Sequence, residues 1–542
     1  MGMIGTEEAT RHEGRMSAAT MAYVTGVDPQ FQVPDRPCLV PGLVTVPLDD
    51  GLAFAGGGNR NTALRGRTAT TLIPRLLPEL DGARTVPELA AALPGVSERT
   101  LYACVSMLYV SGLLQNGPAG DELTLIPAEV IDYLGRNLDT TRVNRSRSEA
   151  GDRLAQIRVL LAGPGALTGV LRTELAASGV DVHGWTGADM PIGAGDFVVA
   201  VDDGDAAAMA RVDEACRRAG IGWLRTAAGE RTAEVGPLFD ARYTGCYDCF
   251  AGPFDRGEPS PARVAAWAAL ITTEIVHLLS RVGQTPSLTG CAVYDLVDWT
   301  QSTRSAYRLP GCPVCLPSEL PGPALAHVYE QAVAFPPREW LNPKDHQMHF
   351  KPSNVALQRY NRDFPAAVKV PLGEEQPIGA LLRRTAGLRE ERDGQVRRWA
   401  PTGGNLGSVQ AYLLALDVPG TDPGWYFYQR GDHSLARIRP LDDTGGVVAA
   451  VSPALAADRP SALLVLTGAL GVVAAKYHEF AYRILCLDAG AALAQLTALT
   501  DEHGATARIA DRWDDTAIAA ALRLDDSEPV TAVVALTLRN DA

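Results

Sequence analysis

The sequence has no excess of basic residues, and this absence limits the partners it can have. Its 542 residues include 49 Lys and Arg against 63 Asp and Glu, for a formal net charge of −14 at pH 7. Non-specific binding to nucleic acid needs a basic face, which this balance disfavours. We therefore predict no nucleic-acid partner.

Long apolar runs are also missing. No stretch of about 18 uninterrupted apolar residues occurs, so we predict no membrane span. Residues 1–15, MGMIGTEEATRHEGR, lack the apolar core of a secretory signal, which predicts a cytoplasmic protein. Disulfides are not expected in that reducing compartment, although the chain has 9 cysteines.

What the chain does contain is enough apolar material for several cores. Hydrophobic residues make up 46% of it, and its length suits roughly three or four domains. Shifts in composition predict boundaries after residues 36, 117 and 320, the last of them within the Pro-rich stretch 317–323. The polar residues 1–36 are predicted to form a flexible tail.

Residues 37–117 are predicted to form a winged helix. Two short strands with a turn at Asp49–Gly51 and a third strand at 62–67 precede three helices, at 69–80, 85–93 and 97–114. The third helix holds a single Arg, which is poor for contact with phosphates. The pattern favours peptide binding, in which an edge strand receives an extended peptide beside an apolar groove. A purely structural role stays open.

Residues 118–320 begin with a linker that carries one helix, at 127–138. A strand at 156–162, a glycine turn, a helix and a second strand then predict a Rossmann-like opening. The turn GPGALTG supplies only part of the dinucleotide fingerprint, and a His-Gly-Trp sequence stands where the acid that holds the ribose is expected. We favour a scaffold that has lost nucleotide binding, and residual nucleotide binding stays open.

Four of the cysteines form two C-x-x-C pairs, about sixty residues apart. They are Cys246, Cys249, Cys312 and Cys315. Two such pairs can close a tetrahedral site of four thiolates without an open position, which is typical of structural zinc. A thioredoxin-like redox pair, the alternative, needs only one C-x-x-C at a helix start. We predict a structural Zn²⁺ site that takes no part in chemistry.

Together, the winged helix, the Rossmann-like region and the paired cysteines resemble the E1-like, ThiF-related partner proteins of thiazole- and oxazole-modified peptide pathways, over about residues 37–320. The resemblance implies that the winged helix captures the leader of a precursor peptide and that the chain works with a YcaO-type cyclodehydratase. In that family the leader lies along the third strand and the third helix. Mapped onto this sequence, the leader-binding residues are Ala63, Leu64, Arg65, Leu101, Tyr102, Val105 and Leu108.

The C-terminal region, residues 321–542, contains a glycine loop with the sequence PTGGN. Glycines let main-chain N–H groups approach a flat or anionic ligand closely. Arg397 and Arg398 come just before the loop and could neutralise a phosphate. A plain tight turn with solvated arginines is the alternative. The candidate ligand-binding residues of the loop are Thr402, Gly403, Gly404 and Asn405.

Lys476 beside Tyr477 is the candidate acid/base pair. The two residues precede a long apolar segment, 481–499, which predicts a buried helix. Burial shifts the proton affinity of such groups and suits them to acid/base chemistry. The alternative is that both are ordinary surface or packing residues.

The segments 397–413, 423–435 and 476–496 resemble, in order and spacing, the azoline-dehydrogenase branch of the flavin-dependent nitroreductase superfamily. The resemblance implies non-covalent FMN, an antiparallel sheet wrapped by helices, and a homodimer whose subunits both line the flavin site. The Lys-Tyr pair of that branch matches Lys476 and Tyr477. No Arg-Arg-Ser-x-Arg phosphate motif is evident. The candidates for holding the FMN phosphate are Arg397, Arg398 and Arg539.

The chain is thus predicted to be a multidomain α/β and α+β protein that captures a leader peptide and oxidises thiazolines or oxazolines to thiazoles or oxazoles. Lys476 or Tyr477 takes the ring proton, and hydride goes to the flavin. Two alternatives stay open. One is a flavin oxidoreductase that acts on another peptide residue, and the other is a non-catalytic adaptor that presents the precursor peptide to the cyclodehydratase.

Overall fold

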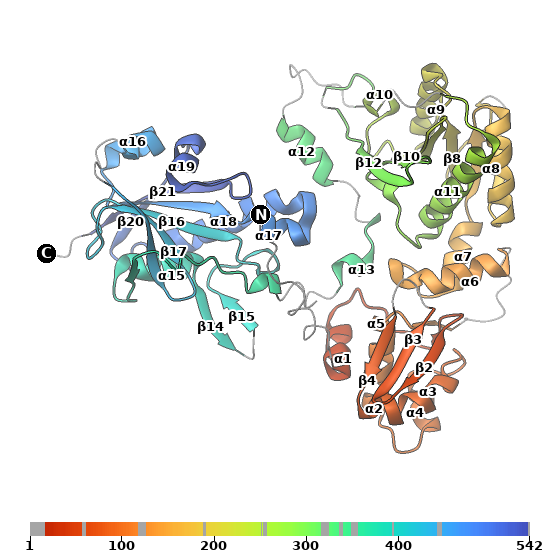
Figure 1. The fold of residues 1–542 in the computed structure, drawn as a ribbon, viewed down its shortest axis with the longest axis horizontal. Helices are drawn as coiled ribbons and strands as arrows, with labels where there is room; N and C mark the ends of the chain where they lie inside the picture. Colours follow the sequence, from red (N-terminus) through yellow and green to blue (C-terminus); the bar gives the residue numbers. More distant parts are fainter. Residues whose placement is uncertain are drawn as a thin grey trace. The chain divides into compact units, whose positions relative to one another are not determined.

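The computed structural model divides the chain into a compact unit of Arg15–Met348 and a second that contains His349–Ala542 (Figure 1). The predicted boundary after residue 320 lies outside the described residues, and α12 (Leu325–Ala334) and α13 (Pro343–His346) belong to the N-terminal unit. The structure describes residues 17–56, 61–117, 126–187, 191–250, 252, 257–309, 311–315, 325–334, 340–347, 356–392, 395–441 and 447–539.

The N-terminal unit contains, near its start, a three-stranded antiparallel sheet in the order β2-β3-β4, followed by helices. The predicted strands and helices of the winged helix are present, but the first helix is broken near Pro74, which cannot donate a main-chain hydrogen bond. The third ends earlier than predicted, at Val110, before Gly112 with a φ of 75°. The elements are β2 (Val44–Leu48), β3 (Gly51–Ala55), β4 (Thr62–Arg65), α2 (Arg67–Thr71), α3 (Ile73–Leu76), α4 (Val86–Ala92) and α5 (Glu98–Val110).

The predicted flexible tail is wrong for part of its length. Residues 18–27 form helix α1 (Ala18–Val27), which the Ser17 side chain caps by accepting from the Thr20 N–H. Met21 is buried, and the Thr25 hydroxyl lies 3.1 Å from that of Ser106 on α5. The helix is therefore held by packing against the winged helix. Just after it, β1 (Pro37–Leu39) pairs with β5 (Leu114–Asn116).

A seven-stranded sheet in the order β12-β11-β10-β9-β8-β6-β7 forms the centre of the N-terminal unit. Pairing is parallel from β7 to β9 and antiparallel from β9 to β12, so the predicted Rossmann-like opening is confirmed at the level of topology. Helices α8 and α11 pack on one face, and α9 packs on the other. The remaining elements are α6 (Ala128–Asn137), α7 (Arg147–Ala155), β6 (Arg158–Ala162), α8 (Gly165–Ala177), β7 (Asp181–Gly184), β8 (Asp196–Val201), α9 (Ala206–Ala219), β9 (Trp223–Ala228), β10 (Thr232–Phe239), α10 (Tyr247–Phe250), α11 (Pro261–Ser280), β11 (Gly290–Asp295) and β12 (Thr300–Ser305).

Helix α11 is, among the described residues, long and apolar enough to cross a membrane by length and composition alone. Half of its most apolar stretch is buried, and Trp267, Ile271 and Ile275 are fully buried in the core beneath the sheet. Core helices of folded domains pass the same test, so α11 is weak evidence for a span.

The C-terminal unit is built on a seven-stranded antiparallel sheet in the order β13-β18-β17-β16-β19-β21-β20. Side chains alternate between its faces. One face packs against α15 and α18, and the other packs against α16 and α19, so the predicted antiparallel sheet wrapped by helices is confirmed. Its elements are β13 (Lys369–Pro371), α15 (Pro377–Ala386), β14 (Leu388–Arg392), β15 (Gln395–Arg398), β16 (Val409–Ala415), β17 (Gly424–Gln429), β18 (Ser434–Pro440), α16 (Val447–Val451), β19 (Ala462–Gly468), α17 (Leu470–Tyr477), α18 (Ala481–Leu499), β20 (Ala505–Ile509), α19 (Asp515–Leu522) and β21 (Val530–Leu538).

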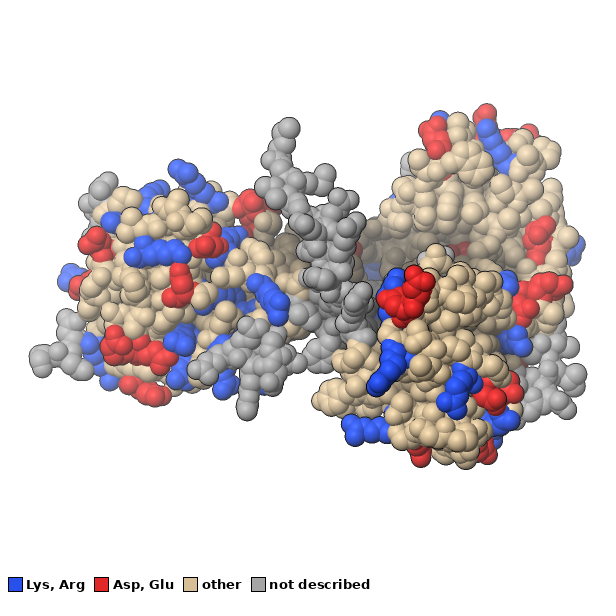
Figure 2. All heavy atoms as spheres, turned by 60° about the horizontal axis from the view of Figure 1, so that its bottom comes forward, with Lys and Arg blue, Asp and Glu red and all other residues tan. Residues whose placement is uncertain are grey.

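Helix α18 has the predicted bounds but is not buried all round. Leu485, Ala492 and Leu496 are buried against the sheet, whereas Leu487 is 61% exposed and Tyr482 is 46% exposed. One face of this helix is therefore open in the single chain. On the face of the molecule that Figure 2 shows, basic and acidic side chains are interspersed rather than gathered into a basic surface.

Candidate functional site

The glycine loop, residues 402–408, runs from β15 into β16 and is shaped by its own side chains. The Thr402 hydroxyl accepts a hydrogen bond of 3.0 Å from the Gly407 N–H, and the Asn405 amide donates one of 2.8 Å to the Val396 carbonyl. Gly404 and Asn405 both have positive φ, at 60° and 58°. Thr402 and Asn405, predicted as ligand contacts, thus serve at least to fix the path of the loop.

Lys476 and Tyr477 meet this loop at Gly404. A Cβ atom added to Gly404 would lie closer than 3.0 Å to the Lys476 Nζ and 2.9 Å from the Tyr477 hydroxyl. Glycine leaves room for both side-chain ends where they lie, and its φ of 60° is one that other residues rarely adopt. The structure therefore brings together two features that lie about seventy residues apart in the sequence.

The environment of the pair moves the two proton affinities in opposite directions. Burial lowers the pKa of Lys476, because its charged form loses hydration. Burial raises the pKa of Tyr477, and the nearby Asp488 carboxylate raises it further. The Lys476 Nζ lies 5.2 Å from the centre of the Tyr477 ring, and among the described residues Lys476 has no salt bridge. Lys476 is therefore the easier of the two to deprotonate relative to its ordinary value, while Tyr477 keeps its proton.

The three arginines predicted to hold a phosphate lie in different surroundings. Arg398 is largely buried and touches the glycine loop: its guanidinium donates to the carbonyls of Gln358, at 2.6 Å, and Asn405, at 3.3 Å. Arg397 is exposed on the β14–β15 ribbon. Arg539 follows β21, whose end pairs near Ala462, whereas the glycine loop joins the sheet near Gly468. Arg539 therefore lies at the far end of β19 from the loop, and the structure does not bring it to the site.

Arg398 faces a cavity that the sequence did not predict. The cavity has a volume of about 330 Å³, and the Arg398 Nη1 atom is buried without a hydrogen-bond partner. Burial, with a contribution from the neighbouring Arg430, lowers the pKa of Arg398 to about 9. The Nη1 atom lies against Gly407, and the Arg398 side chain as a whole puts a cationic group in the cavity wall, which suits an anionic ligand. The cavity is lined by Gln358, Arg359, Tyr360, Asn361, Leu388, Val396 and Arg398.

The signal for this cavity was present in the sequence as Gln-Arg-Tyr-Asn-Arg, residues 358–362. It places polar and basic residues at short spacing. The segment supplies four of the lining residues. The cavity forms only because Arg398, which is distant in sequence, folds against this segment. Residue spacing alone could not predict that contact.

These residues fit a flavin mononucleotide. The cavity is within the size range of small-molecule sites. Arg398 and Arg359 line the cavity and suit a phosphate, while Gly403 and Gly404 let the loop main chain lie close to Ile484, Lys476 and Tyr477.

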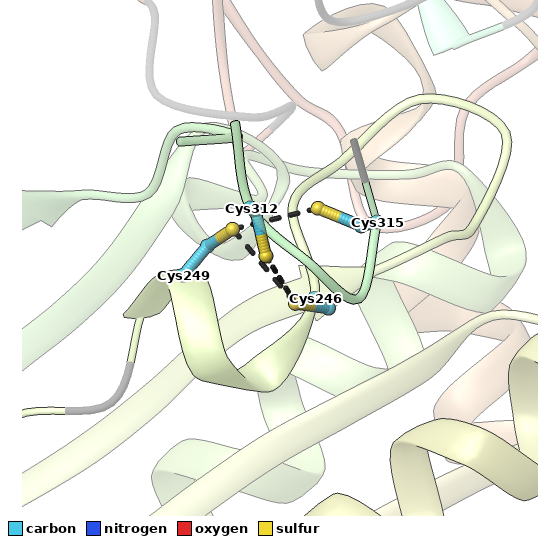
Figure 3. A group of neighbouring side chains, drawn as sticks. All are labelled: Cys246, Cys249, Cys312 and Cys315. Atoms are coloured by element: carbon cyan, nitrogen blue, oxygen red, sulfur yellow. Dashed lines mark hydrogen bonds between the residues drawn. The ribbon is translucent and has the colours of Figure 1, made fainter. Parts of the chain in front are cut away.

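The paired cysteines converge as predicted (Figure 3). The sulfur atoms of Cys246 and Cys312 lie 3.6 Å apart, and those of Cys249 and Cys315 lie 3.5 Å apart. All four lie within 4.8 Å of one another. Four thiolates about 2.3 Å from a central zinc would have edges of about 3.8 Å, so the cluster is compatible with zinc.

Glycines make room for the cysteine cluster. A Cβ on Gly245 would lie 3.0 Å from the Cys249 Cβ and 3.1 Å from the Tyr307 carbonyl, and Gly311 has a φ of 76°. Each glycine comes directly before one C-x-x-C pair and lets it turn tightly.

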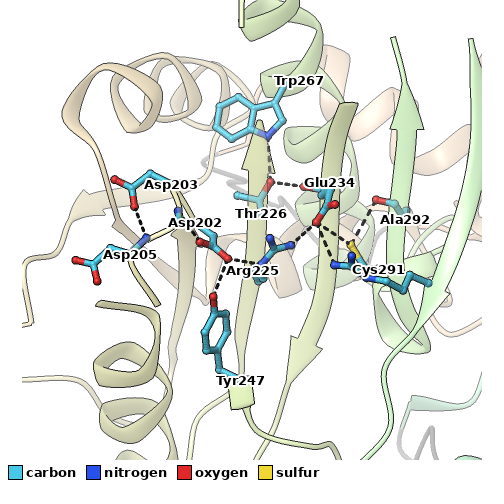
Figure 4. Close-up of polar contacts among 12 residues, drawn as sticks. Asp202, Asp203, Asp205, Arg225, Thr226, Glu234, Tyr247, Trp267, Cys291 and Ala292 are labelled. Carbon is cyan, nitrogen blue, oxygen red and sulfur yellow. Dashed lines mark hydrogen bonds and ion pairs between the residues drawn. The ribbon is translucent and has the colours of Figure 1, made fainter. Parts of the chain in front are cut away.

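The first cysteine pair is tied to a buried charge network in the sheet (Figure 4). Tyr247, the neighbour of Cys246, donates a hydrogen bond of 3.0 Å to Asp202. Asp202 also accepts from Arg225 at 2.7 Å, and Arg225 donates to Glu234 at 2.6 Å. Asp202, Arg225 and Glu234 are at most 4% exposed. The network joins α10 to β8, β9 and β10 and gives the cysteine cluster a rigid base.

The predicted leader-binding residues divide into two groups. Ala63 and Arg65 are exposed on β4, which pairs with β3 on one side and forms the edge of its sheet. Tyr102 is partly exposed, and Leu64 packs partly against the core. The prediction that three residues of α5 line an open groove is wrong, because each is 0% exposed in the core of the winged helix: Leu101, Val105 and Leu108.

Comparisons of the whole chain with known proteins give only partial likenesses. No protein-family model and no curated protein sequence matches it. Solved structures do match over parts of the chain, and the chain is similar in architecture to E1-like, heterocyclase and nitroreductase structures.

Three solved structures illustrate the likeness. A heterocyclase in complex with substrate and cofactor is 18% identical over 52% of this chain and 39% of its own, with a TM-score of 0.42. A nitroreductase structure from Anabaena variabilis is 24% identical over 33% of this chain and 41% of its own, with a TM-score of 0.30. Escherichia coli MccB with MccA is 14% identical over 52% of this chain and 99% of its own, with a TM-score of 0.41. At these values the functional assignment rests on the geometry of the sites.

Proposed function

We propose that this protein is an FMN-dependent azoline dehydrogenase, which oxidises thiazolines or oxazolines to azoles in a ribosomally made precursor peptide. The observation that carries the proposal is the convergence of Lys476 and Tyr477 on Gly404, beside a cavity lined by Arg398, which forms no salt bridge among the described residues. A flat ring over glycine, a phosphate on arginine and a base at the ring edge are the three things such an oxidation needs.

The flavin phosphate would be held by Arg398 and Arg359, and the ring system would lie along Gly403 and Gly404. FMN, when bound, supplies a two-electron acceptor for hydride. The chain's own task is the proton. Lys476 is poised to take it from the adjacent ring carbon because burial lowers its pKa, and Tyr477 stays protonated beside it.

The N-terminal unit would deliver the substrate. The free edge of β4 can add an extended leader segment as a further strand, with Ala63 and Arg65 along it. Holding the leader raises the effective concentration of the core peptide at the flavin. The cysteine cluster would hold structural Zn²⁺.

Two partners complete the proposal. The azolines must be made by a cyclodehydratase, for which a YcaO-type enzyme is the expected partner. A second copy of this chain is expected to cover the exposed face of α18. Tyr482 and Leu487 lie on this face, and both follow the Lys476–Tyr477 pair in the sequence. A homodimer in solution would agree with this use of α18.

The test is to follow oxidation of an azoline-containing peptide by mass spectrometry. Each ring oxidised loses two hydrogen atoms. Lys476→Ala and Tyr477→Phe should stay yellow with bound FMN but lose activity by roughly a hundred- to ten-thousandfold. Normal oxidation by both variants would show that these residues are not the acid/base pair, and absence of bound FMN in the wild-type protein would favour the adaptor.

A further inference from the structure

Asp488 is a buried carboxylate that touches the glycine loop at two points. It lies on α18, is 5% exposed, and its Oδ1 atom accepts a hydrogen bond of 2.7 Å from the Gly403 N–H. Its Oδ2 atom accepts from the hydroxyl of Ser408, which is fully buried. One carboxylate therefore ties both ends of loop 402–408 to a single helix.

The same face of α18 supports the loop one helical turn earlier. A Cβ on Gly403 would lie 2.6 Å from Ile484, four residues before Asp488. Gly404, the next residue of the loop, is where Lys476 and Tyr477 meet. The α17 helix, which carries this pair, ends at Tyr477, and three residues separate it from Ala481, where α18 begins. The first part of α18 therefore contacts the loop, and it follows the Lys476–Tyr477 pair directly in the chain.

We propose that Asp488 is a positioning residue of the active site, whose carboxylate holds loop 402–408 in the shape that sets Gly404 against the Lys476 amine and the Tyr477 hydroxyl. This inference rests on the proposed function and adds a residue to it. Asp488 does not touch the reacting atoms. It acts through the Gly403 N–H and through Ser408.

The charge of Asp488 gives its role a signature that a packing residue lacks. The groups that face it are Tyr477 on α17, Arg398 on β15 and Ser408 in the loop. Its negative charge raises the pKa of Tyr477 and so helps that residue to stay protonated. Neutralising Asp488 without changing its shape should therefore lower the pKa of Tyr477.

The experiment compares Asp488→Ala, Asp488→Asn and a matched control, each assayed with azoline peptide at saturating FMN. Asp488→Ala should lower kcat by roughly a hundredfold, the effect expected of a misplacement of about 1 Å at a reacting centre. Asp488→Asn keeps an acceptor for the Gly403 N–H, so it should recover most of kcat. The alkaline limb of its kcat–pH profile should begin at lower pH than in the wild-type protein.

The control is Asp514→Ala. Asp514 also accepts from a main-chain N–H, that of Ala517 at 2.9 Å, but it caps α19 on the opposite face of the sheet. Its loss should lower the melting temperature and leave kcat and the pH profile unchanged.

The outcomes separate the two proposals. A wild-type protein that binds FMN but oxidises no azoline refutes the proposed function. An active wild type together with an Asp488→Ala variant of normal kcat refutes the positioning role. If Asp488→Ala does not fold, Asp488→Asn decides: an unchanged alkaline limb would overturn the inference, and a shifted one would support it.

Discussion

Arg225 in the N-terminal unit and Arg398 in the C-terminal unit are both buried arginines, but their surroundings differ. Arg225 lies between two carboxylates, Asp202 at 2.7 Å and Glu234 at 2.6 Å, and its pKa is raised. Arg398 forms no salt bridge among the described residues, donates to main-chain carbonyls, and has a pKa lowered to about 9. A buried cation with its charges matched is part of the scaffold, and one left unmatched beside a cavity is available to an anionic ligand.

The same contrast extends to the two units. In the N-terminal unit, Tyr247 and Asp202 are used to fasten the cysteine cluster to the sheet. In the C-terminal unit, Lys476 stays without a salt bridge among the described residues and is destabilised in its charged form by burial. This contrast supports the proposal that chemistry takes place in the C-terminal unit.

The largest expected effect comes from removing metal from the cysteine cluster. Metal analysis should give about one zinc per chain. A chelator, or Cys312→Ser, should unfold much of the N-terminal unit, because structural zinc sites contribute on the order of 10 kcal/mol to folding. FMN binding by the C-terminal unit should survive. Limited proteolysis with flavin absorbance measures both, and unchanged folding after the metal is lost would contradict a structural site.

Arg225→Ala should be the next largest change. It leaves Asp202 and Glu234 buried without their shared cation, and breaking such a pair costs about 3–5 kcal/mol. Denaturant unfolding should show this loss in the N-terminal unit alone. A fall in FMN affinity would show that the buried network is not confined to the scaffold.

Arg398→Met should have the opposite pattern. Loss of a charge-assisted hydrogen bond of about 1.5–3 kcal/mol corresponds to roughly a ten- to hundredfold weaker affinity for FMN. Riboflavin, which lacks the phosphate, should lose less affinity than FMN, and stability should fall less than in Arg225→Ala, because the groups that lose a donor are neutral carbonyls, among them those of Gln358 and Asn405. The matched control is Arg397→Met, since Arg397 is exposed and away from the cavity. Equal losses in both variants would contradict the assignment of Arg398.

The smallest effect is in the pH dependence of kcat. Burial lowers the pKa of Lys476, so activity should rise with pH through a value below that of an ordinary lysine. It should fall again when Tyr477 ionises, above the pKa of an ordinary tyrosine. Tyr477→Phe should remove the fall and keep the rise. A rise that persists in Lys476→Ala would assign the base to another residue.

Local pattern predicted most of the fold. The bounds of α18 were predicted from residues close in sequence, and β19 and β21 are nearly continuous apolar runs, as expected of buried strands. Helix α1 was missed, because its Thr- and Gly-containing sequence becomes a helix through packing of Met21 and Val24 on α5.

The sites were harder to predict where they depend on tertiary contact. The cysteine cluster and the Lys476–Tyr477 pair carry their own signals. Leu101 and Val105 have the apolar spacing expected of a groove, but the same spacing serves a core, and burial decided between the two. Arg398 could be told from Arg397 only once the loop was seen to fold over it.

The most direct test of the central claim, that the C-terminal unit holds a flavin beside Lys476 and Tyr477, is a visible spectrum of the purified full chain titrated with FMN. We predict a saturable shift of the flavin band with quenching of its fluorescence, both weakened in Arg398→Met. A spectrum that stays the sum of free FMN and colourless protein at every concentration would contradict the account.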